Sequence, residues 1–193
     1  MMPYTCMPAQ RGFSLLEVLV AMVVLSLGAL GVMSLVLHAQ QANEQALQRG
    51  RATLLVNDML ERLRANATRE AMVLYNVGER ARAPIGGEQQ QKGTHDCRQA
   101  SCDSQALARF DLADWEQQIM QARGEYHRLD GLPQAHACIS ITTQAQRFDA
   151  TVLLVWHGTG RSRGADDTVC GSNDITSARQ SVRASSRYHP VRG

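Results

Sequence analysis

One carboxylate stands inside an apolar stretch near the start of the chain. Residues 13–37 contain a single ionisable side chain, Glu17. A charged side chain at the centre of a membrane helix costs roughly 2.5 to 3.5 kcal/mol on insertion scales. A carboxylate at such a position is therefore expected to have a function and a charged or polar partner. Opposite charges about 4 Å apart attract far more strongly in a medium of low dielectric than in water. We therefore expect Glu17 to pair with a positive charge inside the apolar layer.

The cysteines are the other candidates for covalent or metal chemistry. Cys6 lies near the start of the chain, and the remaining four are Cys97, Cys102, Cys138 and Cys170. Four cysteines allow three connectivities. Cys97 and Cys102 are five positions apart in one loop, whereas Cys138 begins a predicted strand and Cys170 follows another, so we favour the disulfides Cys97–Cys102 and Cys138–Cys170. A zinc site is the alternative, although its spacings match no standard module; its ligands would be His95, Cys97, Cys102, His136 and Cys138.

Other motifs carry little chemistry. Residues 158–164 have one residue too many for a dinucleotide fingerprint and do not open a helix. Asp166, Asp167 and Asp174 lack the order of an EF-hand loop, which favours a solvated turn over calcium binding. No acid pair, histidine-containing triad or nucleophile elbow stands out. The sequence therefore predicts a protein without enzymatic activity, resident metal or cofactor.

The apolar stretch is long enough to span a membrane. Residues 13–37 would form a helix of about 38 Å, against a hydrocarbon core of about 30 Å. No proline interrupts it, and Gly28 and Gly31 mark its least stable turn. A cleaved secretory signal would have a shorter apolar core of about 7 to 15 residues. A cleaved secretory signal and a plain single-pass membrane anchor are the alternative interpretations of residues 13–37.

Residues 12–17, Gly-Phe-Ser-Leu-Leu-Glu, resemble the class III signal of type IV prepilins and pseudopilins. In that signal a leader ends in Gly, the next residue is usually Phe, and the fifth residue after the cut is Glu. The resemblance implies that a prepilin peptidase cuts between Gly12 and Phe13 and that the new amino group of Phe13 is methylated. It also implies that Glu17 neutralises the N-terminal ammonium of a neighbouring subunit during assembly.

Flanking charge predicts the orientation. The leader, residues 1–12, carries Arg11 and no acid, so the positive-inside rule keeps it cytoplasmic and sends residues 38–193 into the periplasm. Disulfides suit that compartment. The whole chain has 20 Lys and Arg against 18 Asp and Glu, a balance that argues against a general nucleic-acid-binding surface.

Helical periodicity continues from residue 38 to about residue 75. Its apolar positions are spaced by three or four residues, as on one face of a helix; they are Val56, Met59, Leu60, Leu63 and Ala67. The stretch 55–66 is similar to the corresponding part of PilV-type minor pilins, also called type IV pilus modification proteins. Residues 111–115 resemble a second, weaker PilV-like stretch. Ser34 stands near the point where major pilins commonly have proline, which weakens the assignment to a major pilin.

The rest of the chain predicts a loop, a short helix and a sheet. Residues 78–110 read as a variable loop, and residues 111–123 as a helix that Asp111 caps. Three antiparallel strands are expected within residues 137–190, at 138–143, 151–157 and 181–188. A long N-terminal helix packed on an antiparallel sheet is an α+β fold. The pilin resemblance implies the same fold.

The resemblance implies a minor subunit of the type IV pilus that contributes to priming, assembly and twitching motility. Its expected partners are prepilin peptidase, other minor pilins, the major pilin and, before assembly, the inner membrane; it would reside in that membrane and in the pilus fibre. A minor pseudopilin of a type II secretion system is one alternative. A competence pilin that binds DNA through its C-terminal arginines is another; these are Arg179, Arg183, Arg187 and Arg192.

Overall fold

The computed structural model describes residues 14–78, 84–86, 96–124, 131–144, 146–158, 170 and 179–190. The chain forms two compact units, Met1–Ala42 and Asn43–Gly193, and each is considered by itself. The predicted cleavage residues Gly12 and Phe13 lie outside the described residues.

The first unit consists of the N-terminal part of helix α1 (Leu15–Ala65). The backbone N–H groups of Glu17 and Val18 donate to the carbonyl oxygen of Ser14, at 3.0 and 3.3 Å. Every described residue up to Ala42 is exposed. The predicted apolar N-terminal helix is therefore present, and its surface is uncovered in the isolated chain.

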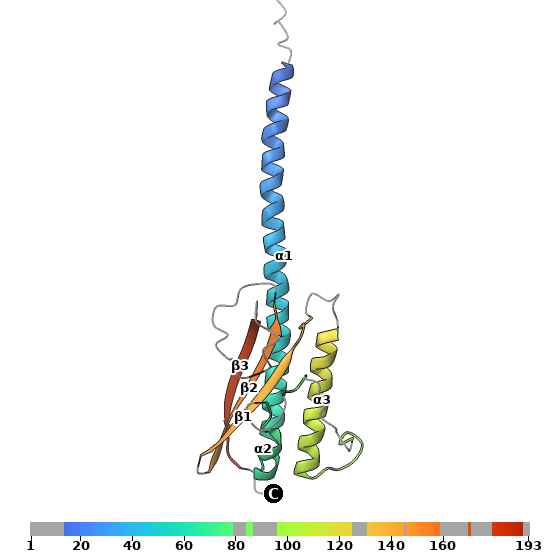
Figure 1. Cartoon of the computed structure of the whole chain (residues 1–193), viewed down its shortest axis with the longest axis vertical. Helices are drawn as coiled ribbons and strands as arrows, with labels where there is room; N and C mark the ends of the chain where they lie inside the picture. The colour runs from blue at the N-terminus through green and yellow to red at the C-terminus, as the bar shows by residue number, and fades with distance from the viewer. Residues whose placement is uncertain are drawn as a thin grey trace, which may run out of the picture. The chain divides into compact units, whose positions relative to one another are not determined.

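The second unit combines three helical segments with one sheet. The C-terminal part of α1 is followed by α2 (Arg69–Tyr75) and α3 (Ser104–Gly124). The strands β1 (His136–Gln144), β2 (Arg147–His157) and β3 (Arg179–Tyr188) form an antiparallel sheet in the order β1-β2-β3. Within this unit α1 runs between the sheet and α3 (Figure 1). The predicted α+β, pilin-like fold is confirmed.

The core of the second unit lies on both sides of α1. Alternate side chains of β2 are buried and face α1, as the period of two in a half-covered strand requires; they are Phe148, Ala150, Val152, Leu154 and Trp156. From the sheet side, the Tyr188 hydroxyl donates to the Leu60 carbonyl oxygen at 2.8 Å. From the other side, Trp115 Nε1 donates to the Leu55 carbonyl oxygen at 2.9 Å. Each buried apolar side chain of this size contributes about 1.5 to 3 kcal/mol.

A second, smaller cluster covers part of the outer face of the sheet. It contains Leu153 and Val155 of β2 together with Cys138 and Cys170. The predicted strand 151–157 is a continuous apolar run for this reason, because its side chains are buried on both faces.

Two helix boundaries differ from the sequence expectation. The predicted helix through residue 75 breaks after Ala65, because the Thr68 side chain caps a new helix by accepting from Ala71 N. Helix α3 begins at Ser104 rather than at 111. Asp103 is its N-cap, with Oδ1 accepting from Ala106 N at 2.7 Å.

Candidate assembly site

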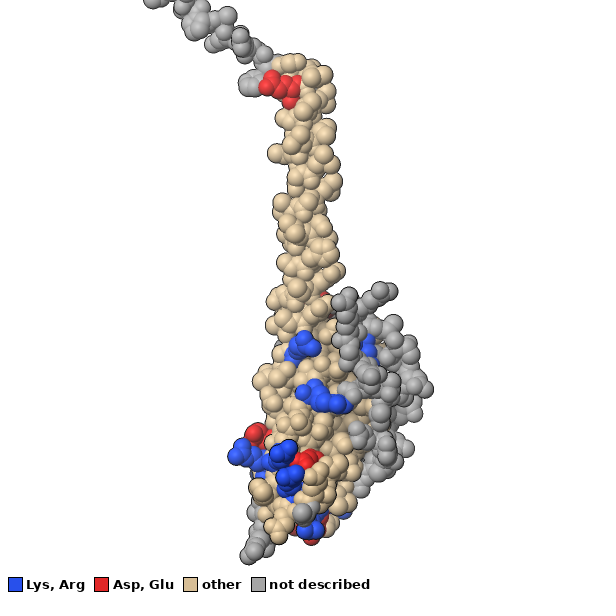
Figure 2. Space-filling view, turned by 90° about the vertical axis from the view of Figure 1, so that its left-hand side faces the viewer, with Lys and Arg blue, Asp and Glu red and all other residues tan. Residues whose placement is uncertain are grey.

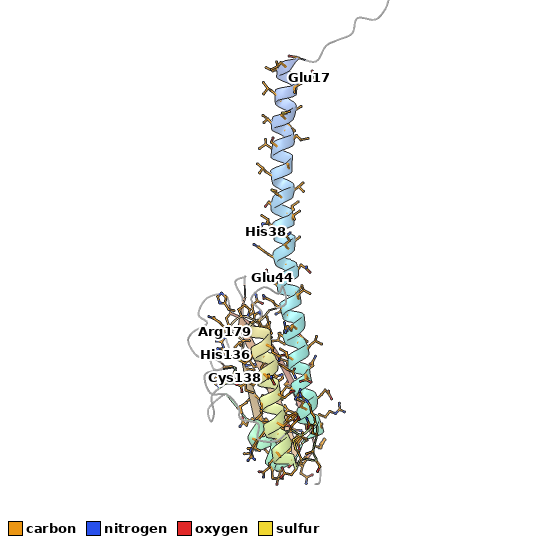
Figure 3. The ribbon with its side chains drawn as sticks, turned by 90° about the vertical axis from the view of Figure 1, so that its right-hand side faces the viewer. Glu17, His38, Glu44, His136, Cys138 and Arg179 are labelled. Carbon is orange, nitrogen blue, oxygen red and sulfur yellow. A yellow bond between two sulfur atoms is a disulfide. The ribbon has the colours of Figure 1, made fainter. Side chains whose placement is uncertain are left out.

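Glu17 occupies the first turn of α1 (Figure 3). Its carboxylate side chain adjoins an apolar surface of the same helix, lined by Val18, Ala21, Met22 and Leu25. Figure 2 shows a red acidic group at the start of an otherwise tan stretch of helix, and Glu17 is the acidic residue in the first turn of α1. The N-terminal end of a helix carries a partial positive charge that favours an acid. A cationic partner for the Glu17 carboxylate would therefore have to approach this same N-terminal end of α1.

The apolar surface of the first unit has no covering within the described chain. Leu15 is 79% exposed, Leu25 is 76% exposed, and the intervening large apolar side chains are all at least 48% exposed. Among the described residues, α1 is the one helix long and apolar enough to cross a membrane. Leaving so much apolar area in water is unfavourable. The helix therefore needs lipid or other apolar helices around it.

A polar cluster centred on Arg62 joins α1 to α3 in the second unit. Arg62 Nε donates to Asp58 Oδ2 at 2.8 Å, and Nη2 donates to Asp114 Oδ2 at 2.7 Å. Its Nη1 donates to Asp111 Oδ1 at 3.4 Å, and the Tyr75 hydroxyl donates to Asp111 Oδ2 at 2.5 Å. We call these five residues the Arg62 cluster. The prediction that Asp111 caps a helix is wrong. Asp111 lies within α3, and its carboxylate accepts hydrogen bonds from Arg62 and Tyr75.

The protonation states in the Arg62 cluster follow from burial and pairing. Burial raises the pKa of Asp111, and hydrogen bonds from Tyr75 and Arg62 only partly offset this effect. Burial also raises the pKa of Asp114, but the hydrogen bond and charge of Arg62 outweigh it and bring that pKa below its ordinary value. Burial and the bond to Asp111 raise the pKa of Tyr75 far above its ordinary value. Tyr75 is thus held as a neutral donor and Asp114 as an anion.

The cluster also anchors the loop before α3. Arg98 donates to Asp114 Oδ1, and its guanidinium carbon lies 5.3 Å from the centre of the Phe110 ring. The cation thereby contacts both an anion and an aromatic face. The contacts of Arg62 with α3 could not be predicted from the sequence, because Arg62 and Asp111 are 49 residues apart. The arrangement packs α3 against α1.

The stretches 55–66 and 111–115 meet at this junction. Residues 55–66 supply Leu55 and Arg62, whereas residues 111–115 supply Asp114 and Trp115. Trp115 is fully buried. Residues of both stretches therefore fix α3 on α1.

Both favoured disulfides are formed in the structure. Cys97 and Cys102 are joined with a Cα–Cα distance of 5.6 Å, and Cys138 and Cys170 with one of 5.7 Å. The zinc alternative therefore lacks its thiolate ligands. His95 lies outside the described residues, which contain no group of three or more potential metal ligands.

The C-terminal arginines that could contact DNA are partly engaged. Arg187 Nε donates to Asp149 Oδ1 at 3.0 Å, and Arg179 donates to the Cys170 carbonyl oxygen. Arg192, the loop motif from 159 to 164, and Asp166, Asp167 and Asp174 lie outside the described residues. Charged side chains on an edge strand fit protection of that edge against pairing with another chain.

Two family models match the chain in succession. The prokaryotic N-terminal methylation motif matches residues 7–33, and type IV pilin Tt1218 matches residues 34–113. Together they cover more than half of the chain. The chain belongs to the type IV pilins. No match was found among curated proteins or among solved structures.

Membership of this family gives the pilin its general role. Type IV pilins are structural subunits and are in general not enzymes. The methylation motif implies processing by a prepilin peptidase, and with the apolar helix it implies anchoring in a membrane and assembly with other pilins. The uncovered surface of Leu15–Leu37 suits both environments, because lipid tails and neighbouring apolar helices each replace water around it.

Proposed function

We propose that this pilin is a minor, PilV-type subunit that helps to start assembly of the type IV pilus and thereby supports twitching motility. The resemblance of residues 55–66 and 111–115 to PilV-type proteins carries the proposal. The contact between the two stretches, through Arg62–Asp114 and Leu55–Trp115, supports it, because it gives both stretches one common structural reason to be retained.

We further propose that cleavage between Gly12 and Phe13 prepares the subunit for assembly. The methylation motif includes both residues. With the leader cytoplasmic and residues 38–193 periplasmic, Glu17 would meet the methylated N-terminal ammonium of a neighbour within the apolar layer. Its position in the first turn of α1 supports this pairing, since a neighbour's N-terminus would lie at the same depth.

The substitution Glu17→Gln tests the pairing. It keeps the shape of the side chain and removes its charge, so membrane insertion should be retained while incorporation into sheared pili falls at least about tenfold. A tenfold loss needs only about 1.4 kcal/mol, well within the attraction of two charges in an apolar layer. Glu44→Gln is the matched control, because Glu44 also lies on α1 but outside the apolar stretch.

The intact mass of both variants should correspond to a mature chain that begins at Phe13. A loss of incorporation would then reflect assembly and not a failure of processing. Equal incorporation of the Glu17→Gln and Glu44→Gln chains would show that Glu17 has no such partner. A mature N-terminus near residue 30 or beyond would establish a secretory signal instead.

Deletion of the gene tests the role in initiation. Surface pili and twitching should decrease while the major pilin is still made and processed, and blocking retraction should restore most pili, because slow initiation then no longer competes with disassembly. Unchanged pili with defective secretion of folded enzymes would favour the type II pseudopilin. Unchanged pili with lost DNA uptake would favour the competence pilin.

A further inference from the structure

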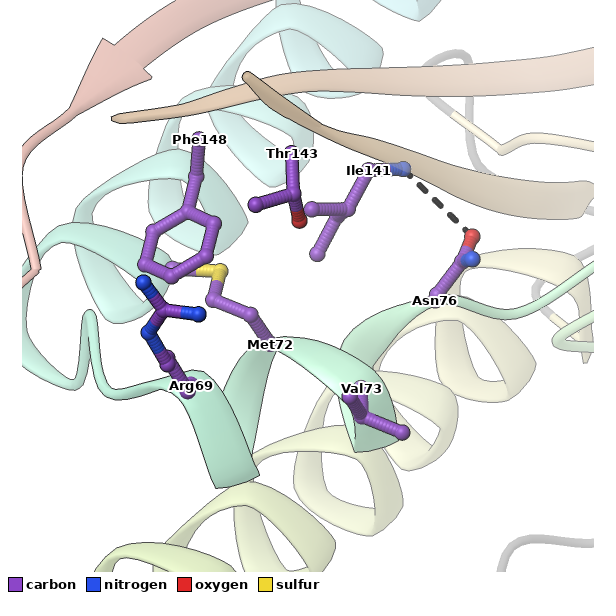
Figure 4. A pocket seen from close by; sticks show the side chains of 7 residues that line it. All are labelled: Arg69, Met72, Val73, Asn76, Ile141, Thr143 and Phe148. Carbon is purple, nitrogen blue, oxygen red and sulfur yellow. Dashed lines mark hydrogen bonds between the residues drawn. The ribbon is translucent and has the colours of Figure 1, made fainter. Parts of the chain in front are cut away.

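A groove lies between α2 and the inner face of the β1–β2 hairpin (Figure 4). Its volume is about 410 Å³. The helix side is formed by residues at positions i, i+3, i+4 and i+7, which are Arg69, Met72, Val73 and Asn76. The sheet side is formed by Ile141, Thr143 and Phe148. We call this feature the α2 groove.

The walls of the α2 groove are apolar but incompletely covered. Met72 and Phe148 are each only 2% exposed, whereas Val73 is 70% exposed. Met72 extends toward the Phe148 ring in Figure 4. An exposed valine beside a buried methionine and phenylalanine offers a place for one further apolar side chain.

The groove opens on a strand edge. Ala137 N–H donates to the Ile85 carbonyl oxygen at 2.9 Å, and Ile139 N–H donates to the Val77 carbonyl oxygen at 2.8 Å. Odd-numbered residues of β1 thus direct their backbone groups away from β2. The next such group, Ile141 N–H, donates to Asn76 Oδ1 at 3.4 Å.

Thr143 follows Ile141 in this alternation, and its backbone has no partner on that edge among the described residues. Segments of the chain itself therefore pair with the edge at Ala137 and Ile139, a side chain caps it at Ile141, and it is open at Thr143. An unpaired edge of this kind is a template for strand addition.

Arg69 supplies a cation at the same end of the groove. Its side chain is exposed, it extends toward Phe148 in Figure 4, and it has no acidic partner among the described residues. A guanidinium can bind a carboxylate through two parallel hydrogen bonds. The groove thus combines backbone donors and acceptors, an apolar wall and one positive charge.

We propose that the α2 groove binds an extended segment of a neighbouring pilin subunit. The segment adds to the open edge of β1 at Thr143, beyond the Ile141 N–H that Asn76 already binds, places an apolar side chain against the exposed Val73, and sets a carboxylate on Arg69. This inference rests on the proposed role as a pilus subunit. A peptide strand can pair with the open backbone edge, pack on the apolar wall of the α2 groove and bind Arg69 at the same time. A lipid or a nucleic acid has no peptide backbone with which to pair with the strand edge.

The test places a photo-crosslinking amino acid at Val73 of the full chain in piliated cells. The expected product is a crosslink to one peptide of another pilin that contains an acidic residue. Arg69→Glu should lower the crosslink yield about tenfold, since it replaces attraction by repulsion. Arg109→Glu is the matched control, because Arg109 is also exposed but lies on α3, and it should leave the yield unchanged.

Three results would overturn the proposal. They are crosslinks only to lipid, nucleic acid or the same chain; a yield that Arg69→Glu does not lower; and no crosslink from a chain that is present in sheared pili. The last result leaves the proposed role as a pilus subunit intact. Absence of the unsubstituted chain from pili would instead overturn both proposals.

Discussion

Removing the charge of Asp114 should destabilise the second unit through the Arg62 cluster. Asp114→Asn preserves the size of the side chain but replaces a carboxylate that accepts from Arg62 Nη2 at 2.7 Å and from Gln118 Nε2 at 3.0 Å. The side chains of Asp114 and Arg62 are only 10% and 19% exposed. Water can therefore compensate little for the lost charge.

The expected cost lies between two limits. An exposed ion pair contributes about 0 to 1 kcal/mol, whereas removing one partner of a buried pair costs about 3 to 5 kcal/mol. Arg62 keeps Asp58 at 2.8 Å and Asp111 at 3.4 Å, so the remaining charge is not left unpaired. We expect a loss of about 2 to 3 kcal/mol in the free energy of unfolding, or about 5 to 10 °C in Tm.

Denaturant and thermal unfolding of a fragment that begins at Asn43 measure this loss. Because Arg62 holds the pKa of Asp114 below its ordinary value after opposing the effect of burial, the charge stabilises the fold above the unfolded pKa of about 3.9. That stability is lost as the pH falls through the lower folded pKa. The difference between Asp114→Asn and the unsubstituted fragment should thus be constant from about pH 5 to 8 and shrink below about pH 4.

Glu61→Gln is the control for this prediction. Glu61 and Arg64 are 4.0 Å apart and both 72% exposed, so breaking this pair should cost less than about 0.5 kcal/mol. If Asp114→Asn costs no more than Glu61→Gln, or if its cost does not change with acid, the Arg62 cluster does not stabilise the fold as argued.

Two further predictions concern the same unit. Replacing Cys138 and Cys170 by serine should lower the free energy of unfolding by about 3.5 kcal/mol, and replacing Cys97 and Cys102 should lower it by about 2 kcal/mol. The reason is that the bridged residues are 32 and 5 positions apart, and a longer closed loop restricts the unfolded chain more. Equal losses in denaturant unfolding would contradict this. Stability should also fall above about pH 10 by up to about 1.4 kcal/mol per pH unit, because tyrosines of the unfolded chain ionise there while the raised pKa of Tyr75 keeps it neutral in the fold. Tyr75→Phe should flatten this alkaline decline, and an unchanged slope would mean that Tyr75 is not held neutral.

Local periodicity was sufficient to predict the sheet. In the last strand, Val182, Ala184 and Tyr188 alternate with Arg183 and Arg187, and the structure buries the first set more than the second. The reason is that a period of two is visible in a few neighbouring residues. The pairing order β1-β2-β3 follows the order of the strands in the chain, as consecutive strands commonly do.

The start of α3 was not predictable in the same way. Aspartate at the beginning of an apolar periodicity is a sound cap signal, and both Asp103 and Asp111 fit that description. Their difference is tertiary: Asp103 accepts from the backbone of its own helix, whereas Asp111 binds Arg62 and Tyr75 from other elements. A single sequence contains no trace of those partners.

The family resemblance and the partner specificity of this pilin have different physical bases. The stretches 55–66 and 111–115 meet at the junction between α1 and α3, where a change in volume or charge would destabilise the fold. The α2 groove takes its helix side from within residues 34–113, which match a type IV pilin, and its sheet side from residues beyond that match. If the α2 groove binds a neighbouring subunit as proposed, its helix wall belongs to the part of the chain that matches the family, and its sheet wall of Ile141, Thr143 and Phe148 lies outside that part. Selectivity for the neighbour would then depend on these three sheet residues.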